Sequence, residues 1–268
     1  MLVLIKGAGD IASGIALRLY RSGFPVIMTD LEEPTSIRRT VCFSEAIPEG
    51  ETQVEGIVGK RAYTGKEALK LCSEGMIAVM ADPAALVVKE VSAEVIVDAI
   101  LAKKNLGTSL QDAGIVIAAG PGFTAGVDCH AVVETKRGHY LGRVLYKGSA
   151  AENTGVPGNI GGYTTERVLR APAEGIFHPA RQIGDEVQEG EIAAFIGEVP
   201  MYCTIRGILR GILREGTPVV TGMKSGDIDP RCEKAHCYSA SDKALAVGGG
   251  VLEAIMHLSR TIPGKNLA

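Results

Sequence analysis

Four short apolar runs, each ended by glycine or a carboxylate, most constrain how this chain of 268 residues can fold. The first run is followed by glycines and by a segment of helical periodicity, and the second run comes directly after that segment. Such an alternation of strand, helix and strand is typical of an α/β fold in which helices cover both faces of a parallel sheet. The runs predicted as strands are residues 2–6, 25–30, 76–81 and 114–119.

The loop after the first run has the spacing Gly7-x-Gly9-x-x-Ala12, and Asp30 closes the next run. This pattern fits a dinucleotide-binding fingerprint, in which glycines admit a phosphate, a helix N-terminus stabilises its charge and the acid binds a ribose. We therefore predict a Rossmann-like parallel sheet domain that binds a nucleotide, with NAD(P) as one candidate. The alternative is a tight turn in which Asp10 caps the helix. On the loop, Asp10 would also repel a phosphate unless its charge were compensated.

Residues 118–162 gather acids, bases, a thiol and glycines after the fourth run. A buried strand that ends in Gly-Pro-Gly is typical of the carboxyl edge of a parallel sheet, where α/β proteins place ligands. The alternative is a loop rich in turn residues. The candidate catalytic residues are Asp128, Cys129, His130 and Glu134. The candidate cofactor-binding residues are Gly7, Gly9, Asp10, Asp30, Lys103, Gly120, Gly122, Arg137 and Asn153.

The carboxyl-terminal half contains an internal repeat between residues 171 and 229, with an offset of 32 between the copies. Two short β-halves of this kind predict a small all-β barrel-sandwich domain that resembles the biotinyl/lipoyl carrier fold. The hairpin between the halves, residues 197–202, contains no lysine, so a structural or docking role is favoured over a swinging arm. The predicted domains are residues 1–166 (Rossmann-like), 167–229 (barrel-sandwich) and 230–268 (a helical segment that packs back on the α/β domain).

Composition limits the functional class and the location. The net charge of −3 gives no electrostatic reason to expect nucleic acid as a partner. The first apolar run is too short for a signal peptide or a membrane span, and six scattered cysteines are consistent with reduced thiols, so we predict a cytoplasmic protein. Cys232, His236 and Cys237 lie close together, but a zinc site needs four ligands, and we predict no metal site. The sequence leaves a homo-oligomer open.

Several long blocks together resemble the selenium-dependent molybdenum hydroxylase maturation proteins, which are related in role to xanthine dehydrogenase accessory factors. The blocks are GAGDIASGIALRLYRSGFPVIM, VDAILAKKNLGT, GPGFTAGVDCHAVVETKRGHYLGRV, ENTGVPGNIGGYTTERVLRAP, GDIDPR and SDKALAVGGGVLEA. The resemblance implies an accessory protein that binds and modifies or inserts the molybdenum cofactor, a pterin dinucleotide. It also implies a molybdenum hydroxylase apoenzyme as the partner.

Under this interpretation Cys129 would pass a selenide or sulfide, because a thiolate is the one good chalcogen nucleophile in its segment. His130, Lys136, Arg137 or His139 would lower the pKa of that thiol or bind the developing anion. Glu134 or Asp128 would act in proton transfer. A single cysteine is more commonly a small buried core residue. Two other functions stay open: an NAD(P)-dependent oxidoreductase, and a non-catalytic docking chaperone for the hydroxylase. Whether the protein is an enzyme is left undecided.

Overall fold

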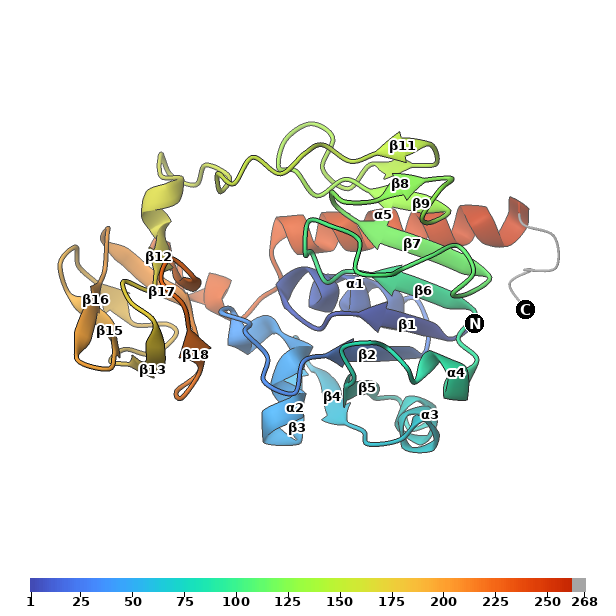
Figure 1. Cartoon of the computed structure of the whole chain (residues 1–268), viewed down its shortest axis with the longest axis horizontal. Helices are drawn as coiled ribbons and strands as arrows, with labels where there is room; N and C mark the ends of the chain where they lie inside the picture. The colour runs from blue at the N-terminus through green and yellow to red at the C-terminus, as the bar shows by residue number, and fades with distance from the viewer. Residues whose placement is uncertain (262–268) are drawn as a thin grey trace. The chain divides into compact units, whose positions relative to one another are not determined.

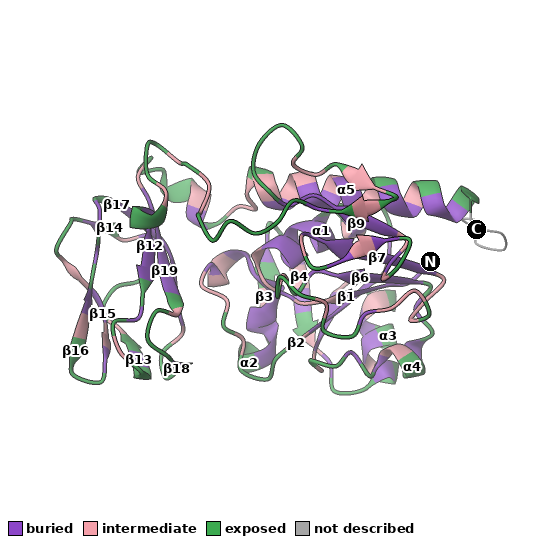
Figure 2. Cartoon of the chain, turned by 45° about the horizontal axis from the view of Figure 1, so that its top comes forward, coloured by how far each residue is buried: buried purple, intermediate pink, exposed green. Residues whose placement is uncertain are grey.

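The computed structural model describes residues 1–261 and divides into two compact units (Figure 1). Unit 1 consists of Met1–Pro34, Cys42–Thr154 and the segment from Ala240 onward. Unit 2 consists of Thr35–Val41 and Gly155–Ser239. Both units have a buried apolar interior beneath more exposed loops (Figure 2). Across the described residues, no helix combines the length and the hydropathy that crossing a membrane requires.

Unit 1 is built on a nine-stranded mixed sheet with the strand order β10-β9-β7-β6-β1-β2-β5-β4-β3. The strands from β9 to β4 in this order are parallel, and the edge strands β10 and β3 are antiparallel to their neighbours. A separate ladder joins β8 (Thr124–Ala125) to β11 (Gly148–Ser149). The nine strands are β1 (Val3–Lys6), β2 (Val26–Asp30), β3 (Glu51–Val54), β4 (Ile57–Arg61), β5 (Ile77–Ala81), β6 (Val95–Asp98), β7 (Ile115–Ala119), β9 (Ala131–Val133) and β10 (Val144–Leu145).

The prediction of a Rossmann-like parallel sheet is wrong in architecture. The sheet is mixed, and the links from β6 to β7 and from β7 to β9 contain no helix within the part of the chain that the structure describes. The alternation of strand and helix seen near the amino terminus therefore does not continue through the second half of the sheet. The helices are α1 (Asp10–Arg21), α2 (Ala46–Glu49), α3 (Gly65–Ser73), α4 (Val88–Val91) and α5 (Asp242–Thr261), with short 3-10 turns η1 (Arg39–Val41), η2 (Phe43–Glu45), η3 (Thr165–Arg167) and η4 (Lys234–Cys237).

The part of the sheet whose links contain no helix is covered by α5. This helix packs against α1 and against β7, β9 and β10 (Figure 1). Glycines permit the close approach. A Cβ on Gly248 would lie 2.8 Å from the carbonyl oxygen of Gly14, and one on Gly250 would lie 2.3 Å from that of Gly142. Gly249 faces open space, and a Cβ there would meet nothing within 4 Å. The glycine run in α5 thus serves helix packing.

Unit 2 contains two four-stranded antiparallel sheets, with the orders β12-β19-β17-β14 and β16-β15-β13-β18. Their inner side chains form one core, which includes Phe177, Leu209 and Ile228. The expectation of a biotinyl/lipoyl-like barrel-sandwich is corrected to this pair of sheets, because the described residues show no such carrier module. The strands are β12 (Val168–Arg170), β13 (Gly175–Pro179), β14 (Glu186–Val187), β15 (Ile192–Ile196), β16 (Val199–Tyr202), β17 (Gly207–Ile212), β18 (Pro218–Val219) and β19 (Lys224–Asp229).

The sequence repeat corresponds to the placement of these strands. β13, β14 and β15 begin at Gly175, Glu186 and Ile192, and β17, β18 and β19 begin at Gly207, Pro218 and Lys224, each 32 residues later. Across the copies, β13 pairs with β18 and β14 pairs with β17. Each copy therefore completes a sheet of the other, and neither could bury its apolar face alone.

A buried ionic network ties β17, β19 and the segment before β12 together in unit 2. Asp227, 1% exposed, accepts hydrogen bonds from Arg167 Nη1 at 2.5 Å and from Arg210 Nε at 2.7 Å. Asp229, on the same face of β19, accepts from Arg231 Nε at 2.9 Å. Burial acts to raise the pKa of Asp229, but hydrogen bonds from Arg231 and the charge of Arg210 outweigh it and hold that pKa at about 2. Asp229 therefore stays ionised throughout the neutral range.

Candidate functional site

The carboxyl ends of the parallel strands in unit 1 form an edge at which three aspartates close their strands or follow directly. Each aspartate accepts a hydrogen bond from the backbone of its own outgoing loop, which satisfies a backbone donor next to a buried strand. Because these carboxylates hold their loops, they fix the shape of the edge. The bonds are Leu31 N to Asp30 Oδ1 at 2.8 Å, Val87 N to Asp82 Oδ2 at 2.8 Å, and Ile100 N to Asp98 Oδ1 at 3.3 Å.

Asp30 differs from the other two because it also reaches across to the glycine loop after β1. Its Oδ2 accepts a hydrogen bond of 2.7 Å from the N–H of Ala8. Burial raises the pKa of Asp30, and the bonds from Leu31 and Ala8 act in the opposite direction. Gly7 precedes this contact with φ +98°, and a Cβ there would lie 2.9 Å from the carbonyl oxygen of Ala99. The loop therefore requires glycine at this position.

The start of helix α1 offers backbone donors to a ligand. Gly9 is the N-cap, no side chain caps the helix, and the first intrahelical bond runs from Ser13 N to Gly9 O at 2.8 Å. Within residues 1–261, the N–H groups of Gly9 and Ile11 have no hydrogen-bond acceptor. Asp10 is the first helical residue rather than the cap that the tight-turn alternative required. Such a helix start carries a partial positive charge and suits an anion.

Lys6, at the end of β1, anchors a polar network beside this loop. Its Nζ donates to Thr108 Oγ1 at 2.9 Å and forms a salt bridge of 3.2 Å with Asp112 Oδ2. The Thr108 hydroxyl in turn donates to Asp98 Oδ2 at 2.7 Å. Lys6, Thr108 and Asp112 were not predicted from the sequence. The available signal was a lysine that ends an otherwise apolar strand directly before a glycine loop.

The loop after β6 is strained and packs on the loop after β7. Leu101 and Lys103 have φ values of 59° and 63°, which L residues rarely adopt. A Cβ on Gly122 would lie 2.7 Å from the backbone of Lys104. Gly120 has φ +82°, and a Cβ there would lie 2.7 Å from Thr135 Oγ1. Of the predicted binding residues, Lys103, Gly120 and Gly122 thus lie in two loops in direct contact, with the Lys103 side chain exposed.

The four residues predicted to be catalytic are engaged in local structure. Cys129 is fully buried in an apolar cluster, and burial together with the charge of Asp128 raises the pKa of its thiol to about 12. Asp128 Oδ2 accepts from Thr124 N at 2.7 Å. His130 Nδ1 accepts from Val116 N at 2.9 Å, and burial lowers the pKa of its imidazole. This environment opposes thiolate formation at Cys129 and favours a neutral His130.

Glu134 and Arg137 are also held by neighbours. The buried Glu134 carboxylate accepts from Lys136 N at 2.6 Å and from Ala151 N at 2.7 Å. Arg137 forms a bidentate ion pair with Asp242 at the start of α5, at 2.5 and 2.9 Å. Asn153 lies exposed in the segment that leads out of unit 1. Glu134 and Arg137 thus organise the loops around β9.

Thiol reactivity tests the assignment of Cys129 to the core. In the folded protein at pH 8, we expect iodoacetamide to modify the exposed Cys232 readily and Cys129 at least about a hundredfold more slowly, because a buried neutral thiol reacts poorly. Peptide mass spectrometry after timed labelling measures both rates. In urea the two rates should converge. Rapid labelling of Cys129 in the folded state would show that its thiol is accessible and ionised.

Fold and edge together define an α/β protein with a glycine loop at the carboxyl ends of parallel strands and a separate antiparallel β unit. No protein-family model matches the chain. The chain is 57% identical over 257 residues to the uncharacterized protein YqeB of Escherichia coli strain K12, a match that covers 96% of this chain and 48% of that protein. It therefore spans about half the length of this curated relative.

Similarity to solved structures is weak. An aspartoacylase family protein from Mesorhizobium loti has 12% sequence identity and a TM-score of 0.27 over 85% of this chain and 84% of that chain. A succinylglutamate desuccinylase/aspartoacylase from Rhodobacter sphaeroides has 25% identity and a TM-score of 0.22, over 24% of this chain and 21% of the other. TM-scores this low establish neither a shared fold nor a shared activity.

These comparisons overturn the resemblance to selenium-dependent molybdenum hydroxylase maturation proteins. The relative is uncharacterised, the structural neighbours are of the aspartoacylase and desuccinylase type, and nothing among them points to a molybdenum hydroxylase, selenium or a xanthine dehydrogenase accessory factor. The predicted role in cofactor maturation is therefore wrong. The two alternatives, an NAD(P)-dependent oxidoreductase and a docking chaperone, find no support either.

Proposed function

We propose that unit 1 is a ligand-binding module whose ligand is a nucleotide, bound at the carboxyl edge of the parallel strands. The observation that carries the proposal is the start of α1, where the N–H groups of Gly9 and Ile11 have no acceptor among the described residues. A phosphate there would accept both donors and would meet the positive end of a helix of 12 residues. Gly7 lets the loop before this point pack on the backbone of Ala99.

Asp30 supplies the second part of the proposed site. It follows the glycine loop at the end of the adjacent strand β2, and each of its oxygens accepts one backbone hydrogen bond. A carboxylate oxygen can accept more than one bond, so Asp30 retains capacity for the hydroxyls of a ribose. The bond from Ala8 fixes the carboxylate relative to the helix start. Phosphate and ribose would therefore be bound by neighbouring strand ends.

Calorimetry with Asp30→Asn tests this proposal against a matched control. We expect ADP, NAD or a related dinucleotide to bind the native protein, and Asp30→Asn to weaken that binding about tenfold or more, because a hydrogen bond to a charged group is lost. Asp82→Asn changes the equivalent residue after β5, whose carboxylate contacts Val87 of its own loop, and should change affinity by less than about twofold. The absence of binding by every nucleotide at millimolar concentration, or equal losses in both variants, would contradict the proposal.

A further inference from the structure

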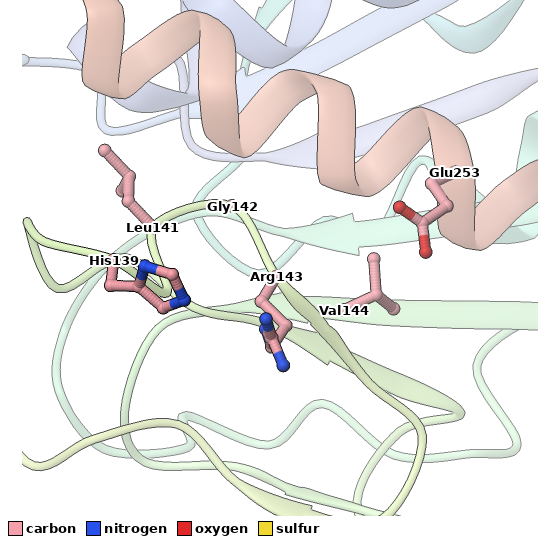
Figure 3. A pocket seen from close by; sticks show the side chains of 6 residues that line it. All are labelled: His139, Leu141, Gly142, Arg143, Val144 and Glu253. Atoms are coloured by element: carbon pink, nitrogen blue, oxygen red, sulfur yellow. The ribbon is translucent and has the colours of Figure 1, made fainter.

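A second candidate site lies in unit 1, beside β10, which is the edge strand opposite β3 in the nine-stranded sheet. A cavity of about 480 Å³ lies between the loop that leads into β10 and helix α5 (Figure 3). This volume falls within the range of roughly 300–1,000 Å³ that is typical of small-molecule sites. Its lining is mostly polar, so an apolar ligand does not fit. The lining residues are His139, Leu141, Gly142, Arg143, Val144 and Glu253.

Two side chains of opposite charge line this cavity without pairing with each other. Arg143 comes from the loop and Glu253 projects from α5 toward Val144 (Figure 3). Among the residues the structure describes, neither side chain forms a salt bridge or a hydrogen bond. Arg143 instead stacks on the ring of Tyr140, with its Cζ 4.7 Å from the ring centroid. Stacking orients a guanidinium and leaves the N–H groups at its edge available for a planar anion.

Backbone contacts hold the loop that carries Arg143 against α5, the helix that carries Glu253. Gly142 N donates to Glu134 O, and Glu134 N donates to Arg143 O, both at 2.9 Å, which continues the β9–β10 ladder. Gly142 has φ +79°, and a Cβ there would lie 2.6 Å from the carbonyl oxygen of Ala246 in α5. Glycine thus lets the loop touch α5, and the cavity walls are set by the packing of backbone on backbone.

Two pairs of rings lie on the loop and the helix that form the cavity, or directly beyond its lining residues. His139 meets Tyr140 edge to face, with ring centroids 5.0 Å apart. One helical turn beyond Glu253, His257 packs on Tyr146 with centroids 4.5 Å apart. Of these rings, that of His139 lines the cavity.

From these observations we infer that the cavity binds a small zwitterion of the amino-acid type, an α-amino acid or a short peptide. The ligand carboxylate pairs with Arg143, for which a bidentate contact is the preferred geometry, and the ligand ammonium pairs with Glu253. A ligand with a single charge would leave one of the two side chains without a partner. Because none of these residues belongs to the edge where Gly9 and Asp30 lie, the inference is independent of the proposed nucleotide site.

Charge-deleted ligands and charge-deleted variants provide a crossed test. Free L-amino acids are first screened by saturation-transfer NMR against the full chain, and the best binder is titrated by calorimetry together with its N-acetyl and its C-terminal amide derivatives. We expect Arg143→Gln and Glu253→Gln each to lower the affinity for the free amino acid about tenfold or more. Arg143→Gln should not further lower the affinity for the amide, because the amide has no carboxylate. Glu253→Gln should not further lower the affinity for the N-acetyl derivative, because that derivative has no ammonium.

Controls and contrary outcomes are defined by the same titrations. Arg260→Gln and Glu74→Gln remove exposed charges elsewhere on unit 1 and should leave affinity unchanged within about twofold. Thermal unfolding checks that all variants fold, which is expected because Arg143 and Glu253 are exposed side chains. The inference is overturned if no amino acid binds at millimolar concentration, or if neither Arg143→Gln nor Glu253→Gln changes the affinity. It is also overturned if inorganic phosphate binds with the same dependence on Arg143 and none on Glu253, which would define an anion site.

Discussion

Replacing Asp227 by Asn should destabilise unit 2 by about 3–5 kcal/mol, because removal of one partner leaves a buried charge without compensation. Asp227 is 1% exposed and accepts hydrogen bonds from both Arg167 and Arg210, whose side chains are 9% exposed. An asparagine carries no charge, so Arg167 loses this ion pair and Arg210 keeps the longer contact of 3.4 Å with Asp229. We expect faster hydrogen exchange at the amides of β17 and β19, which measures the stability of unit 2 without requiring the whole chain to unfold in one step.

The control for Asp227 is an exposed ion pair in the same unit. Glu186 and Arg206 lie 3.2 Å apart with most of both side chains in solvent, and Glu186→Gln should change the free energy of unfolding by less than about 1 kcal/mol. Both variants remove one negative charge, so an effect of net charge alone would be equal in the two. A loss below about 1 kcal/mol for Asp227→Asn would mean that the arginines find other acceptors, and the network would then not be what holds β17 to β19.

Substitutions in the glycine run of α5 should have opposite signs at adjacent positions. Gly250→Ala places a Cβ 2.3 Å from Gly142 O and 2.7 Å from Val133 Cγ1, and should destabilise unit 1 by about 1–3 kcal/mol or more. Gly249→Ala meets nothing within 4 Å and should stabilise the helix by about 1 kcal/mol, the difference in helix propensity between the two residues. Urea unfolding followed by hydrogen exchange in α5 measures both.

The adjacent pair is its own control, since both changes add one methyl group to the same helix. If both variants were stabilised, α5 would not pack on Gly142 and β9 as described. If both were destabilised by similar amounts, the outer face of α5 at Gly249 would be covered by another surface. The first outcome would also remove the contact between Gly142 and α5 that sets the walls of the cavity beside Arg143.

The strands of unit 1 could be predicted because parallel strands that are buried on both faces read as continuous apolar runs. Val3–Lys6, Val26–Asp30, Ile77–Ala81 and Ile115–Ala119 all lie within the predicted runs. The helix-free links could not be predicted, because residues 99–114 contain apolar and polar residues in no clear period, and their path depends on the packing of the Gly120 loop against Lys104. The antiparallel edges depend on pairings as short as two residues, such as Val144–Leu145 on β9.

Part of the candidate site could be proposed from the sequence. The spacing of Gly7 and Asp30 pointed to this edge, and the structure joins their loops through the bond from Ala8 to Asp30. Lys6 and Thr108 were missed because their contact spans 102 residues of sequence, and no local pattern reports it. The role given to Cys129 rested on the polar residues around it in the sequence. Its thiol instead lies in an apolar cluster, which sequence spacing alone did not show.

The resemblance to a molybdenum hydroxylase pathway rested on blocks such as GDIDPR and SDKALAVGGGVLEA. In the structure the first contributes Asp227 and Asp229 to a buried ionic network, and the second forms the tightly packed part of α5. Both blocks therefore have a structural explanation in this chain. Motifs with such roles specify packing more directly than they specify a pathway, and the comparisons gave this pathway no support.

Backbone amide chemical shifts test the central claim, nucleotide binding at the start of α1, most directly. In a titration of the protein with ADP, we expect saturable shifts concentrated at residues 7–12 and at Asp30 and Leu31, because phosphate would accept from the N–H groups of Gly9 and Ile11. Shifts confined to the cavity beside Arg143 and Glu253 would assign the ligand to that other site. Unchanged amides at Gly9 and Ile11 in the presence of millimolar ADP, NAD and a pterin dinucleotide would contradict the claim.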